Sequence, residues 1–414
     1  MEAVAPTTAS KTLDWRMWVP CFGMALCSWL SFVDRQVLTI LSPTIIRDTG
    51  LTNQNFTDAA SFFFLTYTLG NPVWGSVLDF VGLRAGMLIG VAIWTGASAS
   101  HAFMGSFLGF AACRAVLGLG EGVTFPGGLR TAVESLPANL RARAIALSFS
   151  GGTIGAVMMP LLLGPLAIKY GWRVAFLSTA ALGAAWLLIW AAIARPPFLP
   201  KHAKKTTTVK WPNFLERRVW ALMFSYALPA ISPGPLLTIL ALYLNGRLHL
   251  TQSQVNGLSW IPPLTWGLGY FFWGWAADRY AENNRRPIGM MLLLTIISLT
   301  LGLVTMTTNV PLAMTLIGLS TFIGGGFQMV ALKVATYAFP REQAAMMTGI
   351  ASGSWSLVNF LLLRAIGPWT GWMNGGNWEA IFWLIALLPV IGVAVWWVLS
   401  LGDRQPASAV QRPL

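Results

Sequence analysis

Long apolar stretches are the feature that most limits what this chain can fold into. They follow one another from residue 17 to residue 400, separated by short polar segments. About 20 apolar residues in a helix cross the hydrocarbon core of a bilayer, where every backbone polar group needs an internal partner. Only 10% of the 414 residues are charged, against about 25% in an ordinary soluble domain. The sequence therefore predicts an all-α integral membrane protein.

The apolar stretches divide into twelve expected transmembrane spans. These are 17–45, 58–78, 86–104, 106–130, 144–168, 173–194, 219–244, 256–277, 288–308, 311–336, 345–371 and 379–400. The first is too long for a cleavable signal peptide. A polar segment rich in Pro, Lys and Thr divides six spans from six, as expected of a solvated linker. The expected organisation is a cytoplasmic tail (1–16), a six-helix bundle (17–194), a cytoplasmic linker (195–218), a second six-helix bundle (219–401) and a cytoplasmic tail (402–414).

The net charge of +13 is distributed in a way that sets topology. With the N-terminus inside, most of the 27 Lys and Arg residues fall in cytoplasmic segments or at cytoplasmic helix ends. This asymmetry is the positive-inside rule, and it predicts a multi-pass protein of the cell (inner) membrane with both termini in the cytoplasm. The basic excess therefore does not indicate nucleic-acid binding. The three Cys and three His residues lack metal-ligand spacing, so neither a metal nor another cofactor is expected.

The two sets of six spans resemble each other at matching positions. The matched pairs are LTIL at 38–41 and 237–240, GSVLD at 75–79 and GWAAD at 274–278, Pro137 and Pro340, Gly164-Pro165 and Gly367-Pro368, and W-x-x-x-F beginning at Trp172 and Trp378. Five matches in the same order indicate a tandem repeat of two pseudo-symmetric six-helix halves. Parallel halves of this kind place a substrate site at their interface, near the middle of the membrane.

The loop after the second span carries a recognisable motif, GSVLDFVGLRAG, with Gly75, Asp79, Gly82 and Arg84. It resembles the signature loop G-x-x-x-D-R-x-G-R-R of the major facilitator superfamily, with Phe80 in place of the usual Arg. A small residue lets two helices approach closely, and an aspartate at a helix end can pair with arginine or a helix N-terminus. We assign this motif to gating. The alternative is a loop that only sets topology.

The second half carries a partial copy of this loop. It keeps Gly274, Asp278 and Arg279 and then departs from the pattern. We assign these residues to gating as well. Arg130 and Lys333 occupy matching positions near the cytoplasmic ends of spans 4 and 10. Both are interpreted as positive-inside anchors, with the lining of an inward-open vestibule as the alternative.

Four charged residues lie at membrane depth in the first half. Asp34 and Arg35 are adjacent in span 1, and Arg114 and Glu121 lie two helical turns apart on one face of span 4. Facing lipid unpaired, the four would cost on the order of 10 kcal/mol. They must therefore face a cavity or one another. The matching positions of the second half are uncharged, which favours a proton-coupled transporter over a symmetric pore.

The segments around these charges carry a narrower resemblance. F-V-D-R-Q-V-L-T, R-A-V-L-G-L-G-E-G-V-T-F-P, E-S-L-P-A-N-L-R-A-R-A and G-W-R-V-A-F resemble the anion:cation symporter family, which includes hexuronate and galactonate carriers and the vesicular glutamate transporters. The resemblance covers residues 30–180 closely. It implies that Arg35 contacts a substrate carboxylate, that Glu121 is the protonatable coupling residue, and that Asp34 and Arg114 tune it. Arg114 is also a substrate-binding candidate, and Asp34 a proton-coupling one.

The chain departs from this family at two places. Phe149 stands in span 5 where the carriers often have Asn, and span 7 reads LLTILALYL where many have a Trp-Pro pair. Both changes make the expected cavity more apolar. They favour an aromatic or short aliphatic carboxylate over a polyhydroxylated sugar acid.

Further substrate-binding candidates are polar or aromatic residues inside other spans. They are Tyr67 and Asn71 in span 2, Gln328 in span 10, and Trp355, Asn359 and Arg364 in span 11. The amides could bind substrate hydroxyls and Trp355 could stack on a ring, whereas helix–helix hydrogen bonding is the alternative. For Arg364 the alternative to substrate contact is that its long stem carries the charge to the outer surface.

The expected function is proton-coupled uptake of a small organic carboxylate, such as a sugar acid or another monocarboxylate, by alternating access in a monomeric protein. An enzyme is not expected, because the sequence offers neither a nucleophile–base pair nor a metal cluster at membrane depth. ATP-driven pumping is disfavoured because the sequence has no phosphate-binding loop of the Walker type. A drug or metabolite antiporter of the same fold is the alternative. Span 5 reads GGTIGAVMMPLLLGP rather than the G-x-x-x-G-P-x-x-G-G usual in such antiporters. A non-transporting nutrient sensor is also left open.

Overall fold

The computed structural model describes residues 15–137, 140–199, 212–280, 287–339, 341–371 and 376–401. Every regular element within these ranges is a helix. The two expected tails lie almost wholly outside the described residues, as do the middle of the expected linker and Pro340.

The first half runs from the 3₁₀-helix η1 to α8. Its elements are η1 (Trp15–Trp18), α1 (Val19–Ile40), α2 (Ser42–Thr49), α3 (Asn53–Val81), α4 (Leu83–His101), α5 (Phe107–Glu121), α6 (Thr124–Ser135), α7 (Arg141–Tyr170) and α8 (Trp172–Ile193). Ser42-Pro43 begins α2, because proline is favoured in the first turn of a helix. A break after Glu121 separates α5 from α6 within one span.

The second half runs from α9 to α16. Its elements are α9 (Arg217–Ala227), α10 (Pro233–Gly246), α11 (Gln252–Leu258), α12 (Ile261–Tyr280), α13 (Ile288–Ser298), η4 (Leu299–Met306), α14 (Val310–Ala338), α15 (Arg341–Ile366), η5 (Gly367–Thr370) and α16 (Trp378–Ser400). The spans formed by α9 with α10 and by α11 with α12 are broken near their middle or outer third. Each of the other four spans of this half is one uninterrupted helical stretch.

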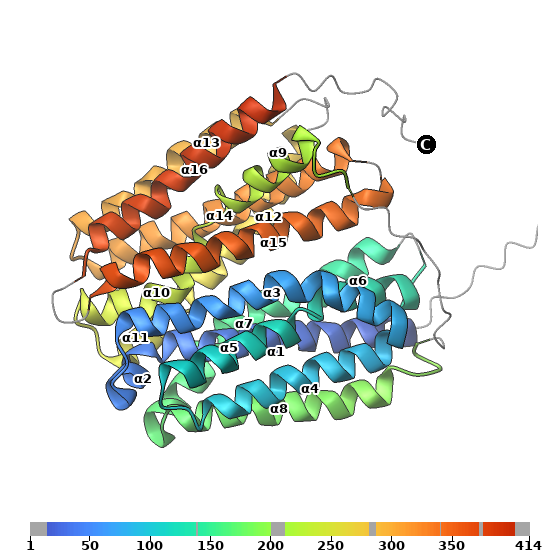
Figure 1. Cartoon of the computed structure of the whole chain (residues 1–414), viewed down its shortest axis with the longest axis horizontal. Coiled ribbons are helices and arrows are strands. Elements are labelled where there is room, and N and C mark those ends of the chain that lie inside the picture. Colours follow the sequence, from blue (N-terminus) through green and yellow to red (C-terminus); the bar gives the residue numbers. More distant parts are fainter. Residues whose placement is uncertain are drawn as a thin grey trace, which may run out of the picture.

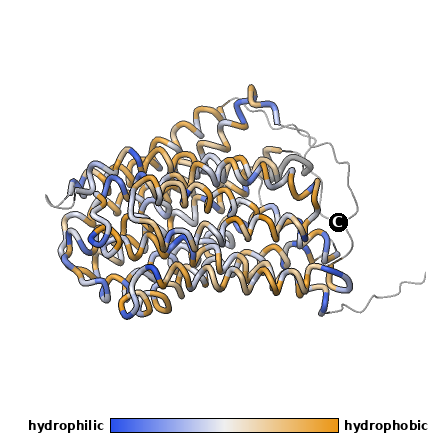
Figure 2. Tube along the Cα trace, turned by 60° about the horizontal axis from the view of Figure 1, so that its bottom comes forward, coloured by the Kyte–Doolittle hydropathy of each residue, from blue (hydrophilic) through white to orange (hydrophobic). Residues whose placement is uncertain are grey.

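The helices have the length and composition of membrane spans. Within the described ranges, eight helical stretches are long and apolar enough to cross a bilayer by length and composition alone. α3 and α4, with 29 and 19 residues, are also long enough to cross it. The two broken spans complete the set, so the twelve predicted spans are confirmed. Figure 2 shows hydrophobic residues along the helices and hydrophilic ones gathered toward their ends.

The two halves pack side by side with their helices running along one common direction (Figure 1). The beginning of α1, the end of α8, the beginning of α9 and the end of α16 lie at the same end of the bundle, because each half crosses it an even number of times. We call this the termini end. The opposite end carries α2, α11 and η5, and we call it the α2 end.

Glycines let the helices of the first half approach closely. A Cβ atom added at Gly151 or Gly155 of α7 would meet the backbone of Ala25 or Trp29 in α1. A Cβ at Gly118 of α5 would likewise meet the backbone of α3. Small residues at such crossings maximise helix–helix packing where lipid supplies no hydrophobic driving force. These crossings fix α1, α3 and α5, the helices that carry most of the candidate site.

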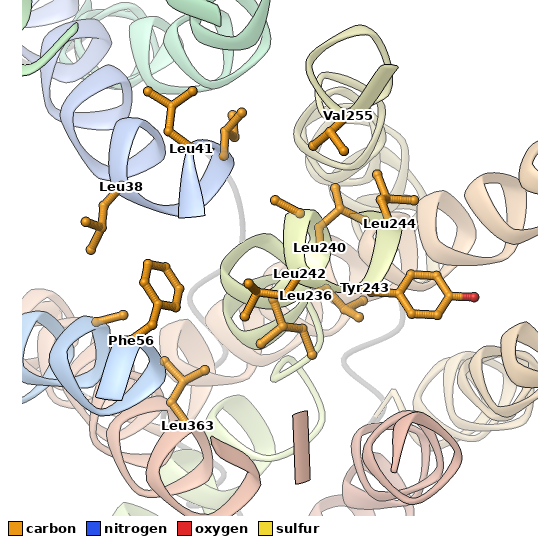
Figure 3. Close-up of a cluster of buried hydrophobic side chains, with 14 of the residues drawn as sticks. Leu38, Leu41, Phe56, Leu236, Leu240, Leu242, Tyr243, Leu244, Val255 and Leu363 are labelled. Carbon is orange, nitrogen blue, oxygen red and sulfur yellow. The ribbon is translucent and has the colours of Figure 1, made fainter. Parts of the chain in front are cut away.

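The halves are joined at the α2 end by an apolar cluster. Leu38 and Leu41 of the first half lie in one cluster with Leu240 of α10, Val255 of α11 and Leu363 of α15 (Figure 3). α10 is buried among helices of both halves, since nearly all of its side chains are buried.

Hydrogen bonds reinforce this junction. Gln252 Nε2 of α11 donates to the Ile40 carbonyl at 2.9 Å, and Thr44 Oγ1 donates to Gln252 Oε1 at 3.1 Å. Asn53 Nδ2 of α3 donates to the Thr370 carbonyl of η5 at 2.9 Å. The α2 end is therefore closed by contacts between the halves.

The α1–α7 crossing gives a test of this packing. We expect Gly151→Leu to destabilise the protein by about 1–3 kcal/mol, because the side chain would have to displace the backbone of α1. The apparent melting temperature of the purified protein in detergent should fall accordingly. The matched control is Gly96→Leu in α4, where a Cβ meets nothing within 4 Å. Equal melting temperatures for the two variants would show that the crossing is not tight.

Candidate functional site

A buried ion pair joins α1 to α5. Arg35 Nε lies 2.6 Å from Glu121 Oε2, and Ser31 Oγ donates to the same oxygen at 2.8 Å. The Glu121 side chain is fully buried, whereas that of Arg35 is 22% exposed. The prediction that the charges of spans 1 and 4 face one another is confirmed for this pair. Glu121 is thus neutralised by one arginine that remains accessible.

Aromatic rings surround the Arg35 guanidinium. Its Cζ atom lies 4.9 Å from the ring centroids of Phe32 and Phe63 and 4.7 Å from that of Tyr67. Phe63 and Tyr67 are one turn apart in α3 and stack on each other at 5.5 Å. Contact between a cation and aromatic faces is favourable and strengthens where water is excluded. The rings therefore hold the guanidinium in place, and the expected neighbour Tyr67 lies beside it.

Asp34 points away from this pair. Its Oδ1 accepts a hydrogen bond from Ser98 Oγ of α4 at 2.8 Å, and Ser98 is bonded in turn to Thr179 of α8 at 2.9 Å. Asp34 is buried, and its Oδ2 has no hydrogen-bond partner among the described residues. Hydroxyl groups of α4 and α8 thus hold the Asp34 carboxylate. The sequence associated Asp34 with Glu121 only because Asp34 is next to Arg35 in the chain.

Arg114 is buried on the same side of the bundle. Its Cζ lies 5.3 Å from the Phe63 ring centroid, and its side chain interacts electrostatically with Glu121 and Asp34. Nε and Nη1 of Arg114 make no hydrogen bond with the part of the chain that the structure describes. The positive charge of Arg114 therefore acts on both carboxylates.

The second half contributes an aromatic pair held by an amide. Trp266 Nε1 of α12 donates to Gln328 Oε1 of α14 at 3.0 Å, and the Tyr270 hydroxyl donates to the same oxygen. The Trp266 ring lies 6.2 Å from Phe32 across the junction of the halves. Trp266 thus contacts both Gln328 and Phe32, and Phe32 lies beside Arg35. The predicted candidate Gln328 is connected to the surroundings of Arg35 in this way.

Sequence reasoning missed Trp266, Tyr270 and Tyr226. Tyr226 of α9 interacts electrostatically with Tyr67 and Tyr270, so the three hydroxyls lie near one another. The segment IPPLTWGLGYFFWGWAAD contains many aromatic residues and nothing charged before its last residue. The one-turn spacing of Trp266 and Tyr270 was the only signal that could have found them.

The span 11 candidates pack within the second half and against α3. Trp355 Nε1 donates to the Ala230 carbonyl at 2.8 Å, and its ring lies 5.9 Å from Phe64 of α3. Asn359 Nδ2 donates to the Trp355 carbonyl at 2.8 Å. Trp355 therefore joins α15 to α3 and to the segment at Ala230, whereas the Asn359 bond lies within α15.

Arg364 lies between α3 and α15. Its guanidinium is 5.6 Å from the Phe62 ring centroid and 5.8 Å from that of Phe360, and it interacts electrostatically with Asp58. The residue is exposed. Its surroundings thus differ from those of Arg35, which is paired with a fully buried carboxylate.

The two loop-motif aspartates pair in the same way in both halves. Asp79 Oδ1 of α3 lies 2.7 Å from Arg130 Nη1 of α6, and Arg130 Nε lies 2.5 Å from Glu134 Oε1. Asp278 of α12 pairs with Lys333 of α14. Spans 2 and 4, and their counterparts 8 and 10, are thus joined at the termini end within each half. The basic partners, Arg130 and Lys333, are the residues interpreted from the sequence as positive-inside anchors, with the lining of an inward-open vestibule as the alternative.

The motif arginines have other contacts. Arg84 Nη2 donates to the Ala191 carbonyl of α8 at 3.2 Å, and the Arg279 guanidinium lies 5.0 Å from the Trp275 ring centroid. Neither contact is with the neighbouring motif aspartate. Arg84 therefore ties α4 to α8 rather than completing the Asp79 pair.

The glycines of the two loop motifs have different structural roles. Gly82 separates α3 from α4 with φ of +86°, a conformation that glycine adopts without strain. A Cβ at Gly75 would meet nothing within 4 Å, and one at Gly274 would only touch Met329 at 4.0 Å. The close helix approach expected at Gly75 is therefore absent in this conformation. Gly82 is required by the turn itself.

Comparisons with known proteins agree with this architecture. A family model described as Major Facilitator Superfamily matches residues 24–269 and 222–414. The hexuronate transporter of Escherichia coli (strain K12) is 21% identical over 421 residues, covering 95% of each chain. The D-galactonate transporter of Escherichia coli O6:H1 is 23% identical over 407 residues, covering 90% of this chain and 93% of that protein. The resemblance to anion carriers predicted from spans 1 and 4 is confirmed by these relatives.

A solved structure shares the fold over nearly the whole chain. It is a bacterial homolog of the human lysosomal transporter Spinster, in an inward-facing and occupied conformation. The TM-score is 0.78 at 16% sequence identity, with 97% of this chain and 100% of that chain covered. At this identity the likeness concerns the fold.

The hydrogen bond to Asp34 can be tested separately from transport. Ser98→Ala removes the donor to Asp34 Oδ1, and a buried acceptor left without a partner costs about 1–3 kcal/mol. We expect the apparent melting temperature in detergent to fall. The control is Ser76→Ala, which removes an exposed hydroxyl in α3 and should change stability by no more than about 0.5 kcal/mol. A Ser98→Ala protein as stable as this control would contradict the assignment.

Proposed function

Because the chain belongs to the Major Facilitator Superfamily, we propose that this transporter takes up a small organic carboxylate together with protons. The observation that carries the proposal is the Arg35–Glu121 pair, in which a partly exposed guanidinium neutralises a fully buried carboxylate. The relatives that transport hexuronate and D-galactonate support an organic anion as substrate. The pair itself supports the coupling to protons.

Arg35 is the residue that binds the substrate carboxylate. A guanidinium holds a carboxylate through two parallel charge-assisted hydrogen bonds, and this geometry favours Arg over Lys. Arg35 is the partly exposed member of its pair, and rings fix its orientation. An arriving anion therefore competes with Glu121 for one preoriented guanidinium.

Glu121 responds to that competition. A buried carboxylate whose partner is withdrawn is strongly destabilised as an anion, so substrate binding at Arg35 favours proton uptake by Glu121. Linkage makes the effect reciprocal, so a bound proton increases the affinity for the anion by the same factor. Arg114 and Asp34, which interact electrostatically with one another, set the balance. Substrate and proton thus load together.

The loaded, neutralised site is free to reorient between the two sides of the membrane. In our proposal the α2 end faces outward and both termini are cytoplasmic, in agreement with the positive-inside distribution of charge. Contacts such as Gln252 with Ile40 then close the outer side. Alternating access requires these contacts to open while the two halves approach each other at the termini end.

The anion assignment is tested by Arg35→Lys. This variant keeps the charge and loses the planar fork, and we expect the affinity for a carboxylate to fall at least tenfold, since hydrogen bonds to charged groups contribute about 1.5–3 kcal/mol. Benzoate and D-glucuronate serve as probes in binding assays on purified protein. The control is Arg47→Lys, at an arginine 74% exposed at the α2 end. Unchanged affinity in Arg35→Lys would refute the assignment.

The coupling assignment is tested by Glu121→Gln in proteoliposomes. The variant cannot release a proton at this position, so we expect it to exchange carboxylate across the membrane but to lose accumulation driven by an inward proton gradient. Glu379→Gln, at an exposed position at the start of α16, should accumulate normally. Accumulation at the wild-type level by Glu121→Gln would place the coupling residue elsewhere, with Asp34 next in line. Gradient-driven efflux by the wild-type protein would instead support an antiporter.

A further inference from the structure

The amide nitrogens of the candidates Asn71 and Asn359 donate hydrogen bonds within their own helices. Asn71 Nδ2 donates to the Tyr67 carbonyl at 2.9 Å, and Asn359 Nδ2 donates to the Trp355 carbonyl at 2.8 Å. The Oδ1 atoms of both asparagines are buried and have no hydrogen-bond partner among the described residues. A ligand with several hydroxyl groups must replace each lost hydrogen bond to water, and every unpaired hydroxyl lowers its affinity.

Gln328 is engaged as well. Its Oε1 atom accepts from Trp266 Nε1 at 3.0 Å and from the Tyr270 hydroxyl. Two donors on one oxygen occupy both of its lone pairs. The Gln328 oxygen therefore has no capacity left to accept a hydrogen bond from a substrate hydroxyl.

Both halves place aromatic rings near Arg35. Phe32 of α1 and Trp266 of α12 lie 6.2 Å apart across the junction, and the Trp266 and Tyr270 rings lie 5.5 Å apart. Phe32, Tyr67, Trp266 and Tyr270 are all partly exposed. Gln328 fixes the Trp266 and Tyr270 rings through its oxygen, so these surfaces are preoriented.

One cation beside partly exposed rings matches a ligand with one carboxylate and one planar ring. We propose that the substrate is an aromatic monocarboxylate, with its carboxylate on Arg35 and its ring packed against Phe32 and Trp266. The inference rests on the proposed function, because it takes Arg35 as the carboxylate-binding residue. Ring–ring contacts contribute about 0.5–1.5 kcal/mol beyond the burial of area, enough to select an aromatic acid over an aliphatic one of the same size.

The test compares three probes on the purified full-length protein. Benzoate has the ring, cyclohexanecarboxylate has the same size and charge without an aromatic face, and D-glucuronate is polyhydroxylated. We expect benzoate to bind about threefold to tenfold more tightly than cyclohexanecarboxylate, and D-glucuronate to bind more weakly than both. D-glucuronate binding as tightly as benzoate would overturn the inference.

Transport measurements keep this outcome separate from the proposed function. If a proton gradient drives accumulation of D-glucuronate but not of benzoate, proton-coupled uptake stands and the aromatic substrate is refuted. If benzoate binds with the expected preference but no gradient drives its accumulation, the aromatic site stands and proton coupling is refuted.

Variants locate the ring. Trp266→Leu should lower benzoate affinity about threefold to tenfold and leave cyclohexanecarboxylate affinity within twofold of wild type. Trp275→Leu, on the same helix but 55% exposed, should change neither. A misfolded Trp266→Leu protein would lose both ligands alike, and Phe32→Leu then gives the same comparison from the other half. An unchanged ratio of the two affinities in a folded variant of either residue would overturn the inference.

Discussion

The buried ion pair between Arg35 and Glu121 is the interaction on which the rest of this molecule depends. Two opposite charges 2.6 Å apart in a membrane interior are tolerated only as a pair, because removing either leaves an uncompensated charge that costs several kcal/mol. The pair requires α1 and α5 to be held at a fixed separation. Glycines supply that condition, with Gly118 packed on α3 and Gly151 packed on α1. The close packing of the helices in the first half and the pairing of Arg35 with Glu121 therefore depend on each other.

The two halves share a scaffold but not a chemistry. The Asp79–Arg130 and Asp278–Lys333 pairs occupy equivalent places, so the repeat is preserved where it braces neighbouring helices. The two halves differ in the side chains that they place at and beside the Arg35–Glu121 pair. The first half presents a guanidinium and the second presents Trp266 and the other rings around Gln328. In the proposed function, the charged group that binds the substrate comes from the first half, and part of the aromatic surface beside it comes from the second half.

The junction at the α2 end and the Arg35–Glu121 pair share the helix α1. Leu240 and its neighbours in α10 pack among helices of both halves, and Gln252 bonds to the end of α1 only a few residues beyond Arg35. One continuous helix, α1, therefore connects Arg35 to the closed end. At the opposite end, the ion pairs of Asp79 with Arg130 and of Asp278 with Lys333 each lie within one half.

The sequence by itself determined the twelve spans, the tandem repeat and the presence of four charges at membrane depth, because these follow from patterns along the chain. It also required these four charges to face a cavity or one another, since unpaired charges in lipid are too costly, and the structure pairs Arg35 with Glu121. Only the tertiary structure decided that Asp34 turns toward Ser98, that Arg130 pairs with Asp79, and that Trp266 and Tyr270 face Gln328. A helix that is apolar all round does not reveal which face points inward, so its rotation is fixed by packing against its neighbours.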